Sequence, residues 1–274
     1  MSDPVGRQLD RLLRREDRYL LQARRAFVKT KLIGVTSLLE EKIPPELQAT
    51  LEKAFYKGFQ LVFEKGTGLI EKSYDKDRLR LEHAVSDRMI EERPNAKTVD
   101  APARRAAQGR AARVAVSTAE GGLLGLLGVG IPDIPLFIGV LLSGIYEIAL
   151  TYGFDYSDPG ERYYILKLIE TSLAGGETIA KANRKLDVLG RELALGEVKL
   201  SSDAEDRAMS QAAMALAEDM IYQKFIQGLP VVGVVGGVFN FTYCRKITAY
   251  ADLKYQKRYL LSKLKSTKGK AINR

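Results

Sequence analysis

The stretch GGLLGLLGVGIPDIPLFIGVLLSGIYEIALTYGF, residues Gly121–Phe154, decides the fold. A second apolar stretch, FIQGLPVVGVVGGVFNFTYC at Phe225–Cys244, carries no charge at all. Neither stretch shows the strict alternation of apolar and polar residues that indicates a half-buried strand, and no Asn-Gly or Asp-Gly hairpin signal occurs between apolar runs elsewhere. We therefore expect an all-α, single-domain, multi-helix bundle with glycine-rich apolar helices at its centre.

Two prolines interrupt the first apolar stretch, and both remove backbone donors from a helix. The pieces on either side are about ten to twenty residues long, whereas a straight bilayer span needs about twenty. The sequence therefore predicts a proline-broken helical hairpin in place of one straight transmembrane helix. Glycines four residues apart in both stretches allow close helix packing. The residues expected to enter the core or a membrane interface are Gly121, Gly125, Leu126, Pro132, Pro135, Phe137, Gly233 and Gly237.

The two apolar stretches fit more than one environment. They suit the buried core of a soluble bundle, where small residues also occur at helix crossings. They equally suit shallow insertion into a membrane, with the cations that follow Cys244 near anionic headgroups. A true transmembrane topology is the third alternative, and the sequence leaves all three open.

Helix signals recur through the rest of the chain. Asp158, followed by Pro159 and by Glu161 three positions later, has the arrangement of a capping box, and Ser202 with Glu205 repeats it. We expect the carboxylates of Asp158 and Glu161 to serve as a structural cap. The predicted helices cover residues 4–42, 45–71, 76–92, 159–174, 177–195 and 203–227, with a loop at 95–102.

The expected single domain has three parts along the chain. Residues 1–100 supply amphipathic helices, residues 101–262 form the helical core, and residues 263–274 form a basic tail. No internal repeat at fixed spacing is apparent.

The net charge is +9, and the last thirty residues account for all of it, because ten cations there face only Asp252. A smaller basic patch lies near residue 105, with no acid between Pro102 and Val116. Such patches attract anionic lipids, nucleic acid or an acidic protein, although a solvated helix face gives the same pattern. The electrostatic candidates are Arg104, Arg105, Arg245, Lys246, Lys254, Lys257 and Arg258.

Cysteine usage and the first residues suggest where the protein works. Cys244 is the single cysteine, so no disulfide within the chain is possible, and this suits a reducing compartment. The start MSDPVGRQLDRLLRRED has no apolar region typical of a secretory signal, and Ser2 excludes N-myristoylation. We expect a cytoplasmic protein.

Catalytic signals are sparse. One histidine and one cysteine cannot form a His/Cys metal cluster, no phosphate-binding loop motif is present, and His83 lies in a charged stretch typical of a surface position. We expect no metal and no cofactor. A carboxylate pair, Asp133 at the proline break and Glu147 in the apolar helix, is the remaining candidate for hydrolase-like acid–base chemistry. The alternative is a structural charge pair, with Arg162 or a cation near Arg245 as the partner of Glu147.

Nucleic-acid binding is a further alternative. Tyr250, Tyr255 and Tyr259 lie among the C-terminal cations and could stack on bases. No helix-turn-helix or other reader motif accompanies them, and their spacing also fits a helix face packed on the protein.

The central part of the chain resembles the EcsC protein family. The resemblance rests on Asp133–Pro135, Ile145–Ala149, Tyr152–Asp155 and Asp158–Arg162, and it extends through the glycine-rich stretch near Pro230. It implies a cytoplasmic, membrane-adjacent bacterial protein, accessory to a membrane export system. It supplies no catalytic residues.

These observations together favour a peripheral protein at the inner face of the membrane. Its expected partner is an anionic membrane surface or a membrane protein complex, with late lysines and arginines adding about 1 kcal/mol each at best. The sequence does not decide the oligomeric state.

Overall fold

The structure is a computed structural model that describes residues 3–32, 45–66, 74–109, 134–226 and 238–272. Within these ranges every regular element is a helix, which confirms the all-α prediction for this part of the chain. The elements are α1 (Pro4–Leu32), α3 (Pro45–Leu61) with the π-turn η1 (Val62–Gly66), α5 (Lys76–Glu92), α6 (Ala96–Val99), α8 (Ile134–Thr151), α9 (Pro159–Leu173), α10 (Thr178–Leu195), α11 (Ala204–Ile226) and α12 (Val238–Ile272).

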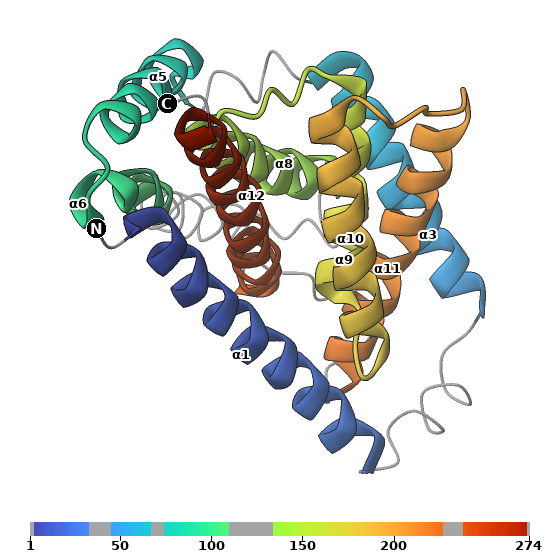
Figure 1. The fold of residues 1–274 in the computed structure, drawn as a ribbon. Helices are drawn as coiled ribbons and strands as arrows, with labels where there is room; N and C mark the ends of the chain where they lie inside the picture. The colour runs from blue at the N-terminus through green and yellow to red at the C-terminus, as the bar shows by residue number, and fades with distance from the viewer. Residues whose placement is uncertain (1–2, 33–44, 67–73, 110–133, 227–237, 273–274) are drawn as a thin grey trace.

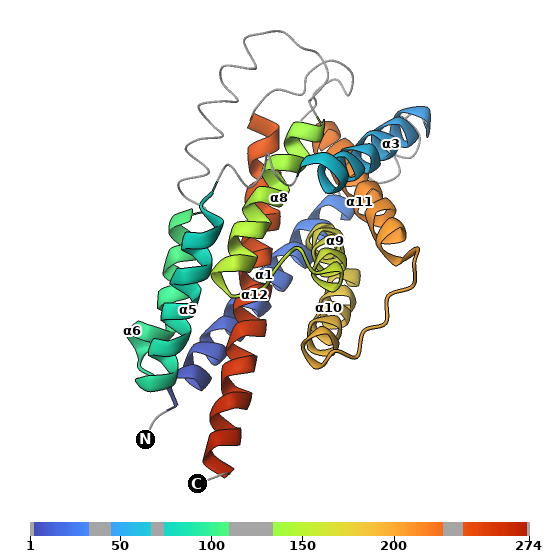
Figure 2. The ribbon, with the colours of Figure 1, turned by 90° about the horizontal axis from the view of Figure 1, so that it is seen from above.

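Helices α8 and α12 form the centre of the fold and run side by side (Figure 2). The interior of α8 is apolar on nearly every side, and Ile138, Leu141 and Ile145 have no exposed surface. A helix that is hydrophobic all round needs packing partners on several faces. The other helices supply them, so the apolar sequence of α8 accounts for its central position.

One side of the central pair is covered by α3, α9, α10 and α11 (Figure 1). Gly58 allows α3 to approach α8 closely, because a Cβ at this position would lie 3.2 Å from Ile138 and 3.3 Å from Ile134. Phe55 packs edge-on against Phe137 of α8 at 6.0 Å. Phe137 is only 6% exposed, so it lies in the core of this structure.

Helix α5 covers the other side of α8, α6 contacts α5 and α1, and α1 runs along an outer edge (Figures 1 and 2). The buried face of α1 includes Val5, Leu12 and Glu16, and Glu16 contacts Lys254 of α12. The N-terminal helices therefore pack into the same core as the later ones.

Local hydrogen bonds set several helix ends. Asp158 accepts a hydrogen bond from the backbone N–H of Glu161 at 3.1 Å, so Asp158 is the predicted N-cap. Asp75 caps α5 in the same way, and α5 has the predicted bounds. Gly196 adopts φ of 69° at the end of α10, a left-handed conformation that glycine adopts without steric cost.

The loop predicted at residues 95–102 is wrong. The side chain of Asn95 accepts hydrogen bonds from the N–H groups of Lys97 and Thr98, and Thr98 completes a capping box that starts α6. Pro102 follows inside a further helical stretch, residues 101–109. Proline near a helix start costs little, because the first N–H groups have no partner within the helix.

The two glycine-rich apolar stretches are only partly described. Residues Gly121, Gly125, Leu126, Pro132, Asp133, Gly233 and Gly237 lie outside the described residues. Helix α8 begins at Ile134 with Pro135 in its first turn, and the ends of the second stretch belong to two helices, α11 and α12. None of the described helices is both long and apolar enough to cross a membrane.

Candidate functional site

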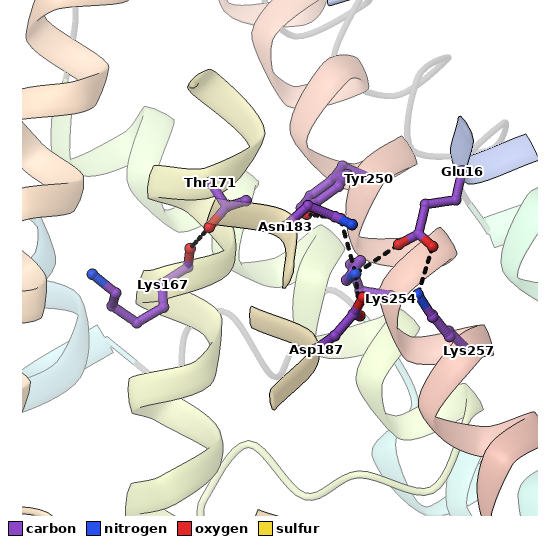
Figure 3. Close-up of polar contacts among 8 residues, drawn as sticks. All are labelled: Glu16, Lys167, Thr171, Asn183, Asp187, Tyr250, Lys254 and Lys257. Atoms are coloured by element: carbon purple, nitrogen blue, oxygen red, sulfur yellow. Dashed lines mark hydrogen bonds and ion pairs between the residues drawn. The ribbon is translucent and has the colours of Figure 1, made fainter. Parts of the chain in front are cut away.

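A buried charge cluster joins α1, α10 and α12 (Figure 3). Lys254 of α12 is 1% exposed, and its Nζ lies 2.7 Å from Glu16 Oε1 and 3.0 Å from Asn183 Oδ1, and it also contacts Asp187. Lys257, one turn later, donates to Glu16 Oε2 at 2.6 Å and to Asp187 Oδ2 at 2.8 Å. Two ammonium groups thus alternate with two carboxylates.

The titration of this cluster follows from its geometry. Burial alone would raise the pKa of Glu16, but the attraction and hydrogen bonds of Lys254 and Lys257 outweigh burial and lower it. Burial likewise opposes the charge of Lys257, yet its hydrogen bonds to Asp187 and Glu16 raise its pKa overall. Both shifts favour the charged forms of Glu16 and Lys257.

The chemistry open to Lys254 is limited by its bonds. A protonated lysine has three donors and no lone pair, and here three acceptors surround it. A nucleophilic or basic role would require an uncharged amine. The cluster is suited to fastening three helices together, since removing one member of a buried pair leaves an uncompensated charge.

A second buried ion pair joins α9 to α12. Arg258 donates from Nη1 to Glu161 Oε1 at 2.6 Å and from Nη2 to Oε2 at 2.9 Å, and the hydroxyl of Tyr255 donates to Oε1 at 2.7 Å. The guanidinium lies over the rings of Phe154 and Tyr164, 4.1 and 4.2 Å from their centroids. Burial opposes the charge of Arg258, but Glu161 raises its pKa overall. The prediction that the Glu161 carboxylate caps its own helix is wrong, because Arg258 and Tyr255 bind both of its oxygens.

The C-terminal cations were predicted to form an exposed basic surface, and the prediction is wrong for most of this set. Lys254, Lys257 and Arg258 bind buried carboxylates, and Lys246 lies 3.7 Å from Asp219. The physical reason is that α12 lies in the centre of the bundle, where unpaired charge is costly. Only Arg245 of this C-terminal set is exposed.

The basic patch near residue 105 also contains one arginine that binds another helix and one that is exposed. Arg105 donates to the carbonyl of Glu82 at 2.9 Å and to Ser86 Oγ at 2.6 Å, so it fastens α5. Arg104 is exposed and donates to the carbonyl of Lys97 at 2.8 Å.

The C-terminal tyrosines are also internal. Tyr250 and Tyr255 have no exposed surface, and Tyr259 is 3% exposed. Their hydroxyls donate to Asn183, Glu161 and Asp87, which are members or neighbours of the charge clusters. The proposal that these rings stack on nucleic-acid bases is therefore wrong.

The carboxylate pair predicted for catalysis is only half described, because Asp133 lies outside the described residues. Glu147 is half-buried on α8 and faces Gly109, where a Cβ would collide with the carboxylate. Arg162, an expected partner of Glu147, instead binds Glu205 at 3.1 and 3.2 Å. Among the described residues no group of three or more His, Cys, Asp and Glu could hold a metal ion.

His83 is not the surface residue that the sequence suggested. Its ring is half-buried between α5, α8 and α12, with Nδ1 3.3 Å from the carbonyl oxygen of Thr151 and the ring edge-on to Tyr259 at 5.7 Å. The ring packs on Gly153, whose φ of 83° and missing side chain make room for it. Burial lowers the pKa of His83, although Asp87 acts in the opposite direction.

Helix α1 carries a row of exposed positive charge. Five arginines at helical spacing are exposed along its outer side and have no carboxylate partner among the described residues. At about 100° per residue they fall within an arc of about 60°, opposite the buried Leu12 and Glu16. We call this set the α1 arginine face: Arg7, Arg11, Arg14, Arg18 and Arg25. The spacing was visible in the sequence, but only the packing of α1 shows which side is exposed.

Comparison with known proteins identifies the family. The model of the EcsC protein family matches residues 7–260. The chain belongs to the EcsC protein family. It is 28% identical over 168 residues to the uncharacterized protein YdbA of Bacillus subtilis (strain 168), and the match covers 57% of this chain. The chain spans 57% of the length of that relative, and no solved structure matches.

Three of the residues that carry the EcsC resemblance make polar contacts between helices. Glu161 binds Arg258, the adjacent Arg162 binds Glu205, and Tyr152 donates to Asp252 of α12 at 2.8 Å. In this structure these members of the EcsC motif therefore fasten helices to one another.

Proposed function

We propose that the protein attaches reversibly to an anionic membrane surface, with the α1 arginine face as its point of contact. The observation that carries the proposal is the exposure of five arginines in one row without carboxylate partners among the described residues. The row runs from Arg7 to Arg25, a length of about 27 Å at 1.5 Å per residue. A straight row of this kind can meet a planar array of phosphate groups along its whole length.

The energetics favour a reversible attachment. A cation close to an anionic leaflet contributes about 1 kcal/mol, so five arginines supply about 5 kcal/mol at best. The attraction is screened over about 8 Å at physiological ionic strength, and it therefore weakens as salt is added. Leu21 is 51% exposed and lies beside the arginines on the same side of α1, where it adds a small apolar contact.

A lipid surface fits better than nucleic acid. The tyrosines expected to stack on bases are buried, so the arginine face has no aromatic groups from them. In this proposal the protein works in the cytoplasm, at the inner face of the membrane, beside a membrane complex such as an export system. The EcsC resemblance is what supports this last part.

Vesicle binding tests the proposal. The purified chain is sedimented with vesicles of pure phosphatidylcholine and with vesicles that contain phosphatidylglycerol, at low and high salt. We expect binding to the anionic vesicles only, and loss of binding at high salt. In the variant Arg11→Glu/Arg18→Glu affinity should fall at least tenfold, because each reversal removes about 1 kcal/mol of attraction and adds repulsion.

A matched control is available on α3. Lys53 and Lys57 are exposed and four residues apart on α3, which lies on the opposite side of the molecule from most of α1 (Figure 1). Lys53→Glu/Lys57→Glu changes the net charge by the same amount and should bind anionic vesicles within twofold of wild type. An equal loss in both variants would show that net charge alone acts. Salt-sensitive binding to DNA without binding to vesicles would sink the proposal in favour of nucleic acid.

A further inference from the structure

Helix α5 has an apolar stripe on its outer side. Leu81, Val85 and Met89 are 65%, 48% and 52% exposed, and the spacing of four residues places them in one row. The opposite side of α5 is buried against α8 and carries Leu79 and Ile90. Residues 101–109 pack beside α5, where Arg105 donates to Ser86 Oγ at 2.6 Å, yet Leu81, Val85 and Met89 stay exposed.

The charges around this stripe are arranged symmetrically. Arg78 lies seven residues before Val85 and Glu92 lies seven residues after it. Their side chains are 67% and 60% exposed, and both fall within about 20° of Val85 around the helix at 100° per residue. Leu81 and Met89 are likewise four residues before and after Val85. Reversing the direction of α5 about Val85 therefore exchanges a cation with an anion and one apolar residue with another.

We propose that α5 pairs with α5 of a second copy of the chain, antiparallel, about a two-fold axis beside Val85. In this arrangement Arg78 of each copy faces Glu92 of the other, and the two valines meet at the centre. A two-fold interface needs a surface that is complementary to itself, and the order of charges along α5 satisfies this requirement. The proposal does not depend on membrane attachment.

The charge pattern favours a second copy over a lipid surface. Glu82 and Glu92 lie beside the stripe together with Arg78 and Arg88, so the stripe offers an anionic membrane no excess of positive charge. The arginine and glutamate at its ends already form ion pairs within α5, Arg78 with Glu82 at 3.8 Å and Arg88 with Glu92 at 2.8 Å. Pairing between copies exchanges exposed ion pairs within α5 for exposed ion pairs between the two helices.

The dimer should be weak. One helix pair buries less surface than a standard stable interface, so we expect a dissociation constant on the order of tens of micromolar. Sedimentation equilibrium over a concentration series should show the average mass rising from 30.4 kDa toward twice that value. Val85→Glu should keep the chain monomeric, whereas Met214→Glu, at a 43% exposed apolar position on α11, should not.

Charge reversal tests the antiparallel register. Arg78→Glu alone and Glu92→Arg alone should each weaken association at least tenfold, because like charges then meet at both ends. An equimolar mixture of these two variants should associate again, since each copy then offers the charge that the other lacks. The variant with both substitutions should also dimerise. Circular dichroism serves as the folding control, and both positions are exposed enough to accept the change.

The outcomes separate clearly. A wild-type mass that stays at 30.4 kDa up to a protein concentration of about 1 mM overturns the proposal, because association weaker than this does not indicate a specific interface. A dimer that survives Val85→Glu, or a mixture of the charge variants that stays monomeric, overturns it as well. Loss of vesicle binding in Val85→Glu, with a monomeric wild type, would assign the stripe to lipid instead.

Discussion

Arg258 and Glu161 meet in a two-hydrogen-bond ion pair inside the bundle, with Nη1 2.6 Å from Oε1 and Nη2 2.9 Å from Oε2. The two residues are 97 positions apart in the chain, and their side chains are 10% and 8% exposed. The pair joins α9 to α12 at the point where the EcsC motif begins α9.

Removing Arg258 should destabilise the protein strongly. Arg258→Ala leaves the Glu161 carboxylate buried with Tyr255 as its remaining partner, and we expect a loss of about 3–5 kcal/mol in the free energy of unfolding. Arg258→Lys keeps the positive charge but not the two parallel hydrogen bonds, so it should lower the free energy of unfolding less than Arg258→Ala does. Urea denaturation measures the free energy of unfolding of both variants. Arg207→Ala, at an exposed ion pair on α11, should change stability by at most about 0.5 kcal/mol. A loss in Arg258→Ala no larger than this control would contradict a role in fastening α9.

Lys254 and Glu16 should behave as a coupled pair. Lys254→Met and Glu16→Gln each leave an opposite charge short of a partner, so each should cost about 3 kcal/mol or more. The loss of unfolding free energy in the double variant should be smaller than the sum of the two single losses by about 1–3 kcal/mol, because both substitutions remove the same interaction. Urea denaturation of all four proteins gives this coupling. Losses that add within about 0.5 kcal/mol would argue that Lys254 and Glu16 act independently.

Stability should fall in acid through Glu16. Its folded pKa lies below the unfolded value of 4.5, so the unfolded chain takes up a proton first as the pH decreases. The stabilisation is complete above about pH 4.5 and is lost as the pH falls through the folded pKa. Thermal unfolding from pH 7 to pH 3 should show a smaller decrease in Glu16→Gln than in wild type. Parallel curves for the two proteins would mean that other carboxylates cause the acid unfolding.

His83 should make stability depend on pH near neutrality. Burial lowers its folded pKa below the unfolded value of 6.5, against the opposing effect of Asp87. Its contribution is therefore present above pH 6.5 and is lost as the pH falls through the folded pKa. The chain has a single histidine, so the urea midpoint should decrease from pH 7.5 to pH 5.5 in wild type. His83→Gln should abolish this decrease. A decrease of equal size in the variant would assign the effect to another group.

Much of the helix pattern could be predicted from the sequence. The bounds of α5 at Lys76–Glu92 and the N-cap at Asp158 were predicted, because a cap forms between residues three positions apart. Two local predictions were wrong: residues 95–102 begin a helix at the Asn95 capping box, and Glu161 binds Arg258 in place of capping α9.

The candidate site could be predicted far less well. Lys254 was predicted as an exposed cation because its neighbours in the sequence are charged, and it instead binds Glu16, which lies 238 positions away. Asp133 and the paired glycines, on which the membrane and enzyme hypotheses partly rested, lie outside the described residues.

The sequence by itself determined the all-helical class, the EcsC resemblance, and the helix ends that depend on caps and turns. These features follow from periodicity and from hydrogen bonds between near neighbours. Only the tertiary structure decided that Lys254, Lys257 and Arg258 are internal, that Glu161 is the partner of Arg258, and that α1 turns its arginines outward. The physical reason is that a charge is buried or exposed according to which helices pack around it, and that packing joins residues far apart in the chain.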